Sequence, residues 1–304
     1  MSVLVNLMIK IVLMVGLGAL LKKTNVITNE LQKGISNLLV TAVLPLNIIA
    51  SSSQELTEES MHGAIFAAIF GLLYYAIALI ILKMISRRLN LSESKKKLFI
   101  TMGAFANTGF IGFPFVEEMF GASTIIYAVI YNLCYQVYFY TYGMYLLSKE
   151  GKTNIWTIFK TPVTISSFLA IILFVGQISL PAPVQSAFST VGAMTVPLSM
   201  FAIGCTLVDM NFIEVIKDKY SYLISAIRLL IFPVIAYGIL KAFHITGTVA
   251  SICILITGLP SGSLNVIVAQ QQDCEPEFAA RAVVQTMILM VISLPFLFWL
   301  IQTL

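Results

Sequence analysis

Ten long apolar stretches, separated by short polar connections, make up most of the chain. An α-helix needs roughly 20 apolar residues to cross a bilayer, and each stretch is close to that length. Runs of this kind predict transmembrane helices, so we expect an all-α membrane protein. Numbered 1 to 10 in chain order, the predicted helices cover residues 3–21, 35–52, 61–84, 98–116, 122–147, 162–180, 186–208, 220–243, 247–269 and 278–303.

Polar and helix-breaking residues interrupt predicted helices 4 and 9. Residues 103–114 place Asn107, Thr108 and Pro114 among glycines in an otherwise apolar segment, and residues 257–265 read Thr-Gly-Leu-Pro-Ser-Gly-Ser-Leu-Asn. Lipid cannot satisfy the backbone groups that an unwound helix exposes, so such a break persists at membrane depth only where protein or a watery cavity surrounds it. Carriers build substrate sites from paired breaks of this kind. The two interruptions therefore indicate a transporter.

The two halves of the chain share a weak internal similarity. Residues 41–50 match residues 193–202 at an offset of 152, and Asn107-Thr108-Gly109 falls on Pro260-Ser261-Gly262 at an offset of 153. Since five helices per half is an odd number, a duplicated half enters the membrane upside down relative to its twin. Inverted repeats place the substrate site near the middle of the membrane, where the two broken helices approach each other. We predict two inverted five-helix repeats, residues 1–150 and 151–304.

Composition and charge agree with a membrane location. Hydrophobic residues make up 59% of the chain and charged residues only 11%, so a water-soluble surface cannot be assembled. Fifteen of the 18 basic residues fall in the odd-numbered connections, and only Lys241 falls in an even one. The positive-inside rule then places both termini outside in a multi-pass protein of the cell membrane. The net charge of +4 follows from this topology and indicates no nucleic-acid partner.

The two interrupted segments, together with the prolines of helices 2 and 7, resemble the auxin efflux carrier family. This family includes plant auxin carriers and bacterial permeases for malate or malonate, and the resemblance covers essentially the whole chain. It implies a fold similar to the bile acid:sodium symporters, with a scaffold of helices 1, 2, 6 and 7 and a transport core of helices 3–5 and 8–10. It further implies that helices 4 and 9 cross, that substrate binds beside the crossing, that the core moves like an elevator, and that two copies dimerise through the scaffold.

Most candidate substrate-binding residues come from the two interruptions. The amide of Asn107 can donate to a carboxylate, and the adjoining half-helix N-terminus offers backbone N–H groups and a partial positive charge. Ser263 and Asn265 play the matching part in helix 9. In the alternative interpretation both asparagines only satisfy freed backbone carbonyls, and the glycines serve helix packing. The set comprises Asn107, Thr108, Gly109, Pro260, Ser261, Gly262, Ser263 and Asn265.

Neighbouring helices add four polar candidates. Asn132 and Gln136 are four residues apart and share one face of helix 5. The family resemblance places a polar residue of this helix near the crossing, which favours Asn132 as a ligand. Asn47 and Ser199 lie near proline breaks and either line the scaffold side of the cavity or cap the backbone. The residues expected to break helices are Pro45, Gly112, Pro114 and Pro197.

Arg228 lies well inside predicted helix 8. A charge at such a position is a functional candidate by default, so Arg228 either contacts the substrate or a gate, or extends to the membrane surface. No Asp or Glu occupies the middle of a predicted helix. We therefore expect export driven by the membrane potential, without an obligatory coupled ion. The alternative is a symporter, in which Gln270, Gln271 and backbone carbonyls hold sodium or a proton rides on the substrate.

A hydrolase interpretation finds no general base. The two histidines, His62 and His244, both precede Ser261, and there is no His-Glu-x-x-His zinc motif. The four cysteines lack both paired and metal-ligand spacing. We therefore predict no enzyme activity, no cofactor and no metal site.

The sequence predicts a secondary carrier for the efflux of small organic anions, such as carboxylates or auxin-like acids. Its expected partners are the organic anion, membrane lipid and a second copy of the chain. An anion channel or a transporter-like membrane sensor is the alternative of another class, because broken helices also build selectivity filters.

Overall fold

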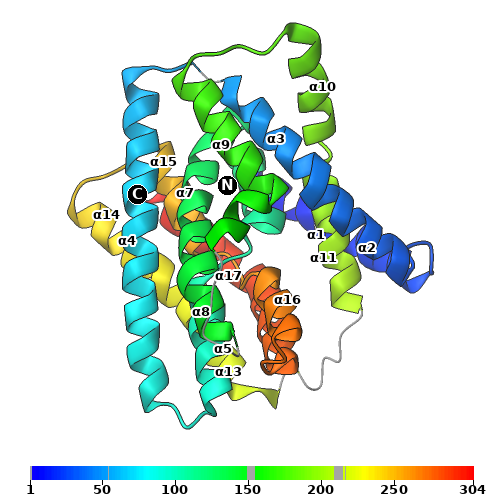
Figure 1. The fold of residues 1–304 in the computed structure, drawn as a ribbon, viewed down its shortest axis with the longest axis vertical. Helices are drawn as coiled ribbons and strands as arrows, with labels where there is room; N and C mark the ends of the chain where they lie inside the picture. The colour runs from blue at the N-terminus through cyan, green and yellow to red at the C-terminus, as the bar shows by residue number, and fades with distance from the viewer. Residues whose placement is uncertain (1, 54, 149–154, 209–214, 216) are drawn as a thin grey trace. The chain divides into compact units, whose positions relative to one another are not determined.

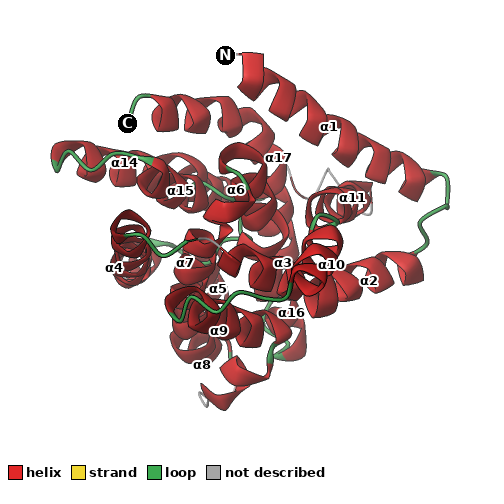
Figure 2. Cartoon of the chain, turned by 90° about the horizontal axis from the view of Figure 1, so that it is seen from above, coloured by secondary structure: helices red, strands yellow, loops and turns green. Residues whose placement is uncertain are grey.

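The computed structural model describes residues 2–53, 55–148, 155–208, 215 and 217–304. Within these ranges the chain is helical, and the only extended pairing is an isolated antiparallel bridge between Ala106 and Ser261. Figure 2 shows helices joined by loops and no strand in the described part of the chain. The predicted all-α class is confirmed. The predicted boundary between repeats, at residues 150 and 151, lies outside the described residues.

Five described helical segments are long and apolar enough to cross a membrane, judged by length and composition. Each coincides with one of the predicted helices. They are Asn29–Ser53, Glu58–Arg88, Ala182–Val208, Lys219–Ala242 and Pro276–Gln302, and two shorter apolar helices cover Pro162–Val175 and Thr248–Thr257. Ten spans, and the assignment of helices to a scaffold and a transport core, stay predictions.

The backbone contacts divide the chain into two compact units. The first unit comprises residues 1–64, 109–130 and 159–210, and the second comprises residues 65–108, 131–158 and 211–304. Helices wholly within the first unit are α1 (Ser2–Lys23), α2 (Asn29–Leu38), η1 (Leu39–Val43), α3 (Leu44–Ala50), η2 (Ser51–Ser53), α6 (Phe113–Phe120), η4 (Ala122–Thr124), α9 (Pro162–Val175), α10 (Ala182–Gly192) and α11 (Thr195–Val208) (Figure 1).

The second unit holds the helices that carry most of the candidate site. They are α5 (Glu93–Ala104), η5 (Phe139–Gly143), α8 (Met144–Leu147), α13 (Lys219–Ala226), η7 (Ile227–Ile231), α14 (Phe232–Ala242), α15 (Thr248–Thr257), α16 (Ser263–Gln271) and α17 (Pro276–Gln302). Four helices run from one unit into the other: α4 (Glu58–Arg88), η3 (Thr108–Gly112), α7 (Ile125–Tyr138) and η6 (Ile155–Lys160).

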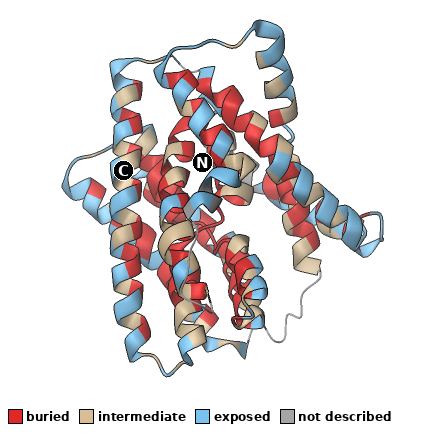
Figure 3. Ribbon diagram, viewed as in Figure 1, coloured by how far each residue is buried: buried red, intermediate tan, exposed pale blue. Residues whose placement is uncertain are grey.

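Helix α4 carries a stripe of exposed apolar side chains. Ile65, Ile69, Leu73, Ile77 and Ile80 recur at helical spacing and are each about half exposed, between 49% and 59%. Figure 3 shows exposed positions repeated along the length of this helix. Water would disfavour such a stripe, whereas lipid tails would solvate it. The burial pattern therefore agrees with a helix that faces the bilayer.

Three prolines follow wide helical turns instead of ending their helices. A proline lacks the N–H of the regular ladder, and its ring collides with the carbonyl four residues earlier. Pro45, Pro114 and Pro233 each occupy the second position of an α-helix that comes directly after a π-helical turn, η1, η3 and η7 respectively. The wider turn makes room for the ring, so helical structure continues through each proline.

Two glycines let α1 and α11 pack with their backbones nearly touching in the first unit. A Cβ on Gly18 would lie 2.6 Å from the Cα of Phe201, and a Cβ on Gly204 would overlap the carbonyl oxygen of Val15. Small residues at a helix interface permit this close approach in membranes. The same helix α1 contributes Lys10, whose ammonium group forms an ion pair with Glu118 at 2.6 Å.

Candidate functional site

The two breaks predicted in the sequence lie side by side in the second unit. The first break separates α5, which ends at Ala104, from the π-turn that begins at Thr108, and the second separates α15 from α16. The backbone N–H of Asn107 donates to the carbonyl of Pro260, and the N–H of Gly262 donates to the carbonyl of Phe105, both at 2.9 Å. These reciprocal bonds make the antiparallel bridge between the two segments. Each break thus satisfies backbone groups that the other exposes.

Gly262 is required by the close approach of the two backbones. A Cβ at this position would lie 2.8 Å from the carbonyl oxygen of Ala106, which is part of the bridge itself. The backbone of Gly262 has a φ of −73°, which any residue can adopt, so space and not conformation demands glycine. The paired segments therefore leave room for glycine alone at position 262.

Ser261 is tied to both sides of the paired breaks. Its hydroxyl donates to the carbonyl of Met102 in the last turn of α5 at 2.8 Å, and its backbone N–H donates to the hydroxyl of Thr286 in α17 at 3.1 Å. Both contacts are buried. Ser261 therefore anchors the second break to α5 and α17, and this arrangement leaves its hydroxyl committed to the protein.

The two candidate asparagines differ in what their side chains do. The amide nitrogen of Asn107 donates to the hydroxyl of Ser263 at 3.2 Å and so links the first break to the first turn of α16. The amide nitrogen of Asn265 donates to the carbonyl of Gly262 at 3.0 Å, which is the backbone-satisfying role. Its Oδ1 atom is buried and has no hydrogen-bond partner among the described residues. One acceptor of Asn265 is thus available to a donor that the chain itself does not supply.

Helix α7 brings a second layer of polar side chains to the first break. The hydroxyl of Thr108 donates to Oδ1 of Asn132. Gln136 lies one turn further along the same helix, and both amides are about 4% exposed. The shared face predicted from their spacing is therefore buried. Hydrogen bonds connect Asn107 to Ser263 and Thr108 to Asn132, and the backbone pairing joins these residues to Pro260, Ser261, Gly262 and Asn265.

The helix ends at the paired breaks give the site its electrostatic character. Helix α16 begins at Ser263 after Gly262, and no side chain caps its first turn. The N–H groups of its first turn carry a partial positive charge at the break, which suits an anion. Helices α5 and α15 both end at the breaks and present carbonyl groups with partial negative charge. The site therefore offers both donors and acceptors on neutral groups.

Arg228 caps one of these carbonyl ends. Its Nη1 atom donates to the carbonyl of Gly103, in the last turn of α5, at 2.7 Å. The side chain is 0% exposed and does not extend to the surface of the structure. A cation at a helix C-terminus opposes the dipole of that helix and is stabilised there. The sequence identified Arg228 as unusual, but its partner is a backbone carbonyl, which has no sequence signature.

The candidates of the first unit form a separate polar group. Nδ2 of Asn47 donates to Oε2 of Glu117 at 3.0 Å and to the hydroxyl of Thr195 at 3.2 Å. Burial raises the pKa of the Glu117 carboxyl above its ordinary value, and the bond from Asn47 opposes part of that rise. Ser199 is buried, and its hydroxyl has no hydrogen-bond partner among the described residues. Sequence reasoning missed Glu117, because this residue directly follows a predicted helix.

The remaining candidates of the first unit are backbone positions. Gly109 has room for a side chain, since a Cβ there would lie 3.7 Å from Cδ1 of Leu44, an ordinary van der Waals distance. Gly112 ends the π-turn η3 before Pro114. Pro197 lies in the first turn of α11, directly after the turn that separates this helix from α10. Their expected role as ligands or helix breaks near a substrate stays a prediction.

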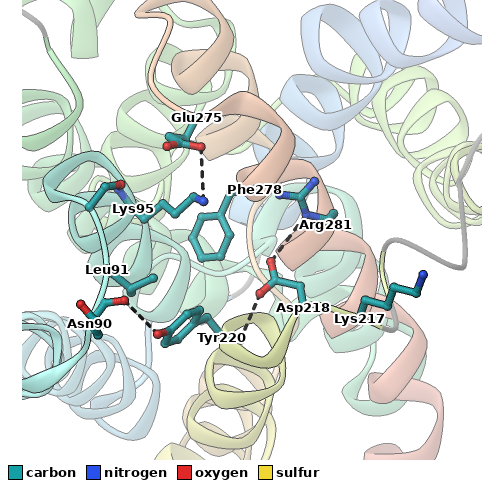
Figure 4. A pocket seen from close by; sticks show the side chains of 10 residues that line it. Asn90, Leu91, Lys95, Lys217, Asp218, Tyr220, Glu275, Phe278 and Arg281 are labelled. Carbon is teal, nitrogen blue, oxygen red and sulfur yellow. Dashed lines mark hydrogen bonds and ion pairs between the residues drawn. The ribbon is translucent and has the colours of Figure 1, made fainter.

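A charged hollow of about 510 Å³ opens elsewhere in the second unit. Figure 4 shows Lys95 directed at Glu275, Arg281 at Asp218, and the hydroxyl of Tyr220 at the carbonyl of Asn90. Asp218 also accepts the backbone N–H of Tyr220 at the start of α13. These contacts tie α5, α13 and α17 together. The charged side chains of the hollow therefore serve to hold these helices and need no ligand to explain them. No group of three or more metal-ligating side chains occurs among the described residues.

Comparison with known proteins identifies the family. A family model described as "Membrane transport protein" matches residues 3–155 and again residues 151–298. A protein of Methanothermobacter thermautotrophicus, described as an uncharacterized transporter, is 24% identical over 290 residues, which cover 94% of this chain and 95% of the relative. A second uncharacterized transporter, from Methanocaldococcus jannaschii, is 23% identical over 303 residues, with coverage of 93% and 95%. These descriptions point to transport and not to catalysis. The chain therefore belongs to the membrane transport protein family, the auxin efflux carrier family that its sequence resembles.

Proposed function

We propose that this transporter is a secondary carrier of small organic anions and that it exports them across the cell membrane. The observation that carries the proposal is the reciprocal pairing of the two breaks, which brings the amide of Asn107, the hydroxyl of Ser263 and the first turn of α16 to one place. Neutral donors and a helix N-terminus can hold a carboxylate without a fixed counter-charge. Malate, malonate and indole-type acids all present such a group, as expected for a malate permease-like member of the family.

The proposed transport step is an elevator-type movement of the core with alternating access. The paired breaks support this proposal because their bonds are internal to the second unit, so the anion site can move as one body. Homodimerisation through the scaffold belongs to the same proposal and rests on the family resemblance. A channel or sensor is the less favoured function, since two different breaks within one chain do not repeat around a ring.

Two asparagine variants test the substrate site. We expect Asn107→Ala to weaken binding of malate, malonate or indole-3-acetate about ten- to hundredfold, because one hydrogen bond to a charged group is worth roughly 1.5–3 kcal/mol. Asn265→Ala should weaken binding as well, because the amide of Asn265 holds the carbonyl of Gly262 at the start of α16. Binding is measured by the rise in unfolding temperature of purified protein, since a ligand of the folded state stabilises it.

Asn37→Ala is the matched control, because Asn37 is exposed on α2 and its side chain makes no part of the breaks. Folded Asn107 and Asn265 variants with wild-type affinity would exclude these residues as ligands. Loss of folded protein in both would instead support the backbone-satisfying interpretation.

The driving force separates two mechanisms. Neutral groups at the site leave a bound monoanion uncompensated, and each elementary charge responds to the membrane potential by about 2.3 kcal/mol per 100 mV. We therefore propose export without an obligatory coupled ion. Sodium symport through Gln270 and Gln271 has little support, because both are exposed at the far end of α16, roughly 10 Å along the axis from its first turn.

A specific observation favours proton coupling as the second candidate. Glu117 is a partly buried carboxyl with a raised pKa, so it can hold a proton at a higher pH than an exposed glutamate. Its hydrogen bond to Asn47 sets it within the polar group of the first unit. In the alternative explanation, Glu117 has no part in proton transfer, and its pKa is raised only because it is partly buried beside the Lys10–Glu118 ion pair.

Reconstituted vesicles with the membrane potential clamped distinguish these mechanisms. We expect that neither a sodium gradient nor a pH gradient concentrates malonate, and that an imposed potential does. Accumulation against a gradient driven by pH alone in wild type, and its loss in Glu117→Gln, would establish proton symport in place of the uniport. The Glu117→Gln variant retains an acceptor for Asn47 and so controls for the loss of that bond.

The proposed topology places both termini and the even-numbered connections outside. It rests on the distribution of basic residues, fifteen in the odd connections against one in the even connections. Cysteines introduced at Glu58 and Ser94 of a cysteine-free background should react differently with an impermeant thiol reagent on intact cells. Position 58 should be labelled and position 94 protected, and the opposite pattern would reverse the orientation.

A further inference from the structure

Arg228 uses only part of its hydrogen-bonding capacity. Its Nη1 atom donates to Gly103, whereas the buried Nε and Nη2 atoms have no hydrogen-bond partner in the described structure. These two nitrogens form the side edge of the guanidinium plane. In proteins this edge donates two parallel hydrogen bonds to the two oxygens of a carboxylate. The unbonded Nε and Nη2 atoms of Arg228 are therefore the pair whose geometry matches a carboxylate.

The charge of Arg228 is also unbalanced. A guanidinium stays protonated in proteins even when it is buried. Among the described residues no carboxylate forms an ion pair with Arg228, and the groups that bond to it or lie beside it, the carbonyl of Gly103 and the hydroxyl of Tyr74, are neutral. The dipole of α5 offsets a fraction of a charge at most. A buried cation in this condition favours the binding of an anion.

Three tyrosine hydroxyls surround the same region. The hydroxyls of Tyr74, Tyr75 and Tyr131 are buried, and those of Tyr75 and Tyr131 have no hydrogen-bond partner in the described residues. The hydroxyl of Tyr74 lies close enough to Arg228 to act as a weak acceptor. Their rings pack together, with centroids 5.1 Å apart for Tyr74 and Tyr75 and 5.6 Å apart for Tyr75 and Tyr131. The ring of Tyr74 also packs against that of Phe232, one helical turn after Arg228, with centroids 5.8 Å apart.

The chemistry of this cluster selects an anion. Guanidinium nitrogens donate hydrogen bonds and cannot accept them, so Nε and Nη2 of Arg228 require acceptors. The tyrosine hydroxyls can donate as well. Buried polar atoms without partners call for a bound ligand, ion or water, and here the donors gather beside an uncompensated positive charge. Water would satisfy the hydrogen bonds but would leave the charge unbalanced.

We propose that the side edge of Arg228 and the hydroxyls of Tyr74, Tyr75 and Tyr131 form a binding site for the carboxylate group of a small organic anion. The site lies within the second unit. Its donors are different side chains from those of Asn107 and Asn265, which donate hydrogen bonds at the paired breaks. It therefore stands independently of Asn107 and Asn265. The enclosure of the donors favours small, planar carboxylates over bulky anions.

Formate tests the site directly, because it is the smallest carboxylate. Sodium formate is added to the purified full-length chain in detergent at pH 7, and a bulky organic sulfonate keeps the ionic strength constant. We expect a saturable rise in the unfolding temperature of wild type. Arg228→Gln should abolish the rise, and Arg228→Lys should weaken formate binding at least tenfold, because an ammonium keeps the charge but not the planar edge.

Matched controls separate this site from other sites. Arg281→Gln should respond like wild type, because Arg281 pairs with Asp218 and Glu277 elsewhere in the same unit. Arg228→Gln should lower the formate response equally in the wild-type and the Asn107→Ala backgrounds, which distinguishes failure of this proposal from failure of the proposed substrate site. Tyr74→Phe combined with Tyr131→Phe keeps the charge and the rings but removes two hydroxyls, and it should weaken formate binding several-fold.

Several outcomes would overturn the proposal. The first is folded wild type without a formate-dependent rise, and the second is an equal rise in Arg228→Gln. If Arg228 variants do not fold, an unchanged formate response in the double tyrosine variant would overturn it as well. A rise with chloride that matches or exceeds the rise with formate would show that the site does not select carboxylates.

Discussion

The reciprocal backbone bonds between the two breaks are the constraint on which the rest of the site depends. Each break exposes N–H and carbonyl groups that neither lipid nor a regular helix can satisfy. Asn107 with Pro260, and Gly262 with Phe105, solve this problem in both breaks at once. The pairing demands glycine at position 262, because any side chain would collide with Ala106. It also fixes where α16 begins, and hence where its N-terminal charge points.

Charge near the breaks follows from the same geometry. Three helix ends meet there, and the carbonyl end of α5 carries the bond from Arg228. A fixed cation at that end is stabilised by the partial negative charge at the C-terminus of α5. The free edge of Arg228 and the nearby tyrosine hydroxyls then make the second unit rich in donors. Such an environment suits a protein that moves anions. No carboxylate of the described residues bonds to Arg228, so its positive charge stays available to an anion.

The sequence predicted which residues belong to the site better than it predicted which groups these residues bond to. Asn107, Gly262 and Asn265 stood out because polar residues and glycines are rare in apolar stretches, and the spacing of Asn132 and Gln136 predicted a shared face that is indeed buried. The backbone pairing itself was not predictable in detail, since carbonyl and N–H groups are common to every residue. The sequence did not single out the tyrosines near Arg228, because the chain holds 12 tyrosines and nothing in their spacing marks these three. The helix continues through Pro45 because of the π-turn before it, and such a turn has no clear sequence signal.

Substrate protection of a cysteine in the paired breaks tests the central claim most directly. Ser263 begins α16, is partly exposed, and accepts the bond from Asn107, so Ser263→Cys in a cysteine-free background reports on that place alone. A saturating ligand from the panel of malate, malonate and indole-3-acetate should slow alkylation of this cysteine by a small thiol reagent at least tenfold. Alkylation that proceeds at the same rate, while the same ligand still raises the unfolding temperature, would place the substrate elsewhere.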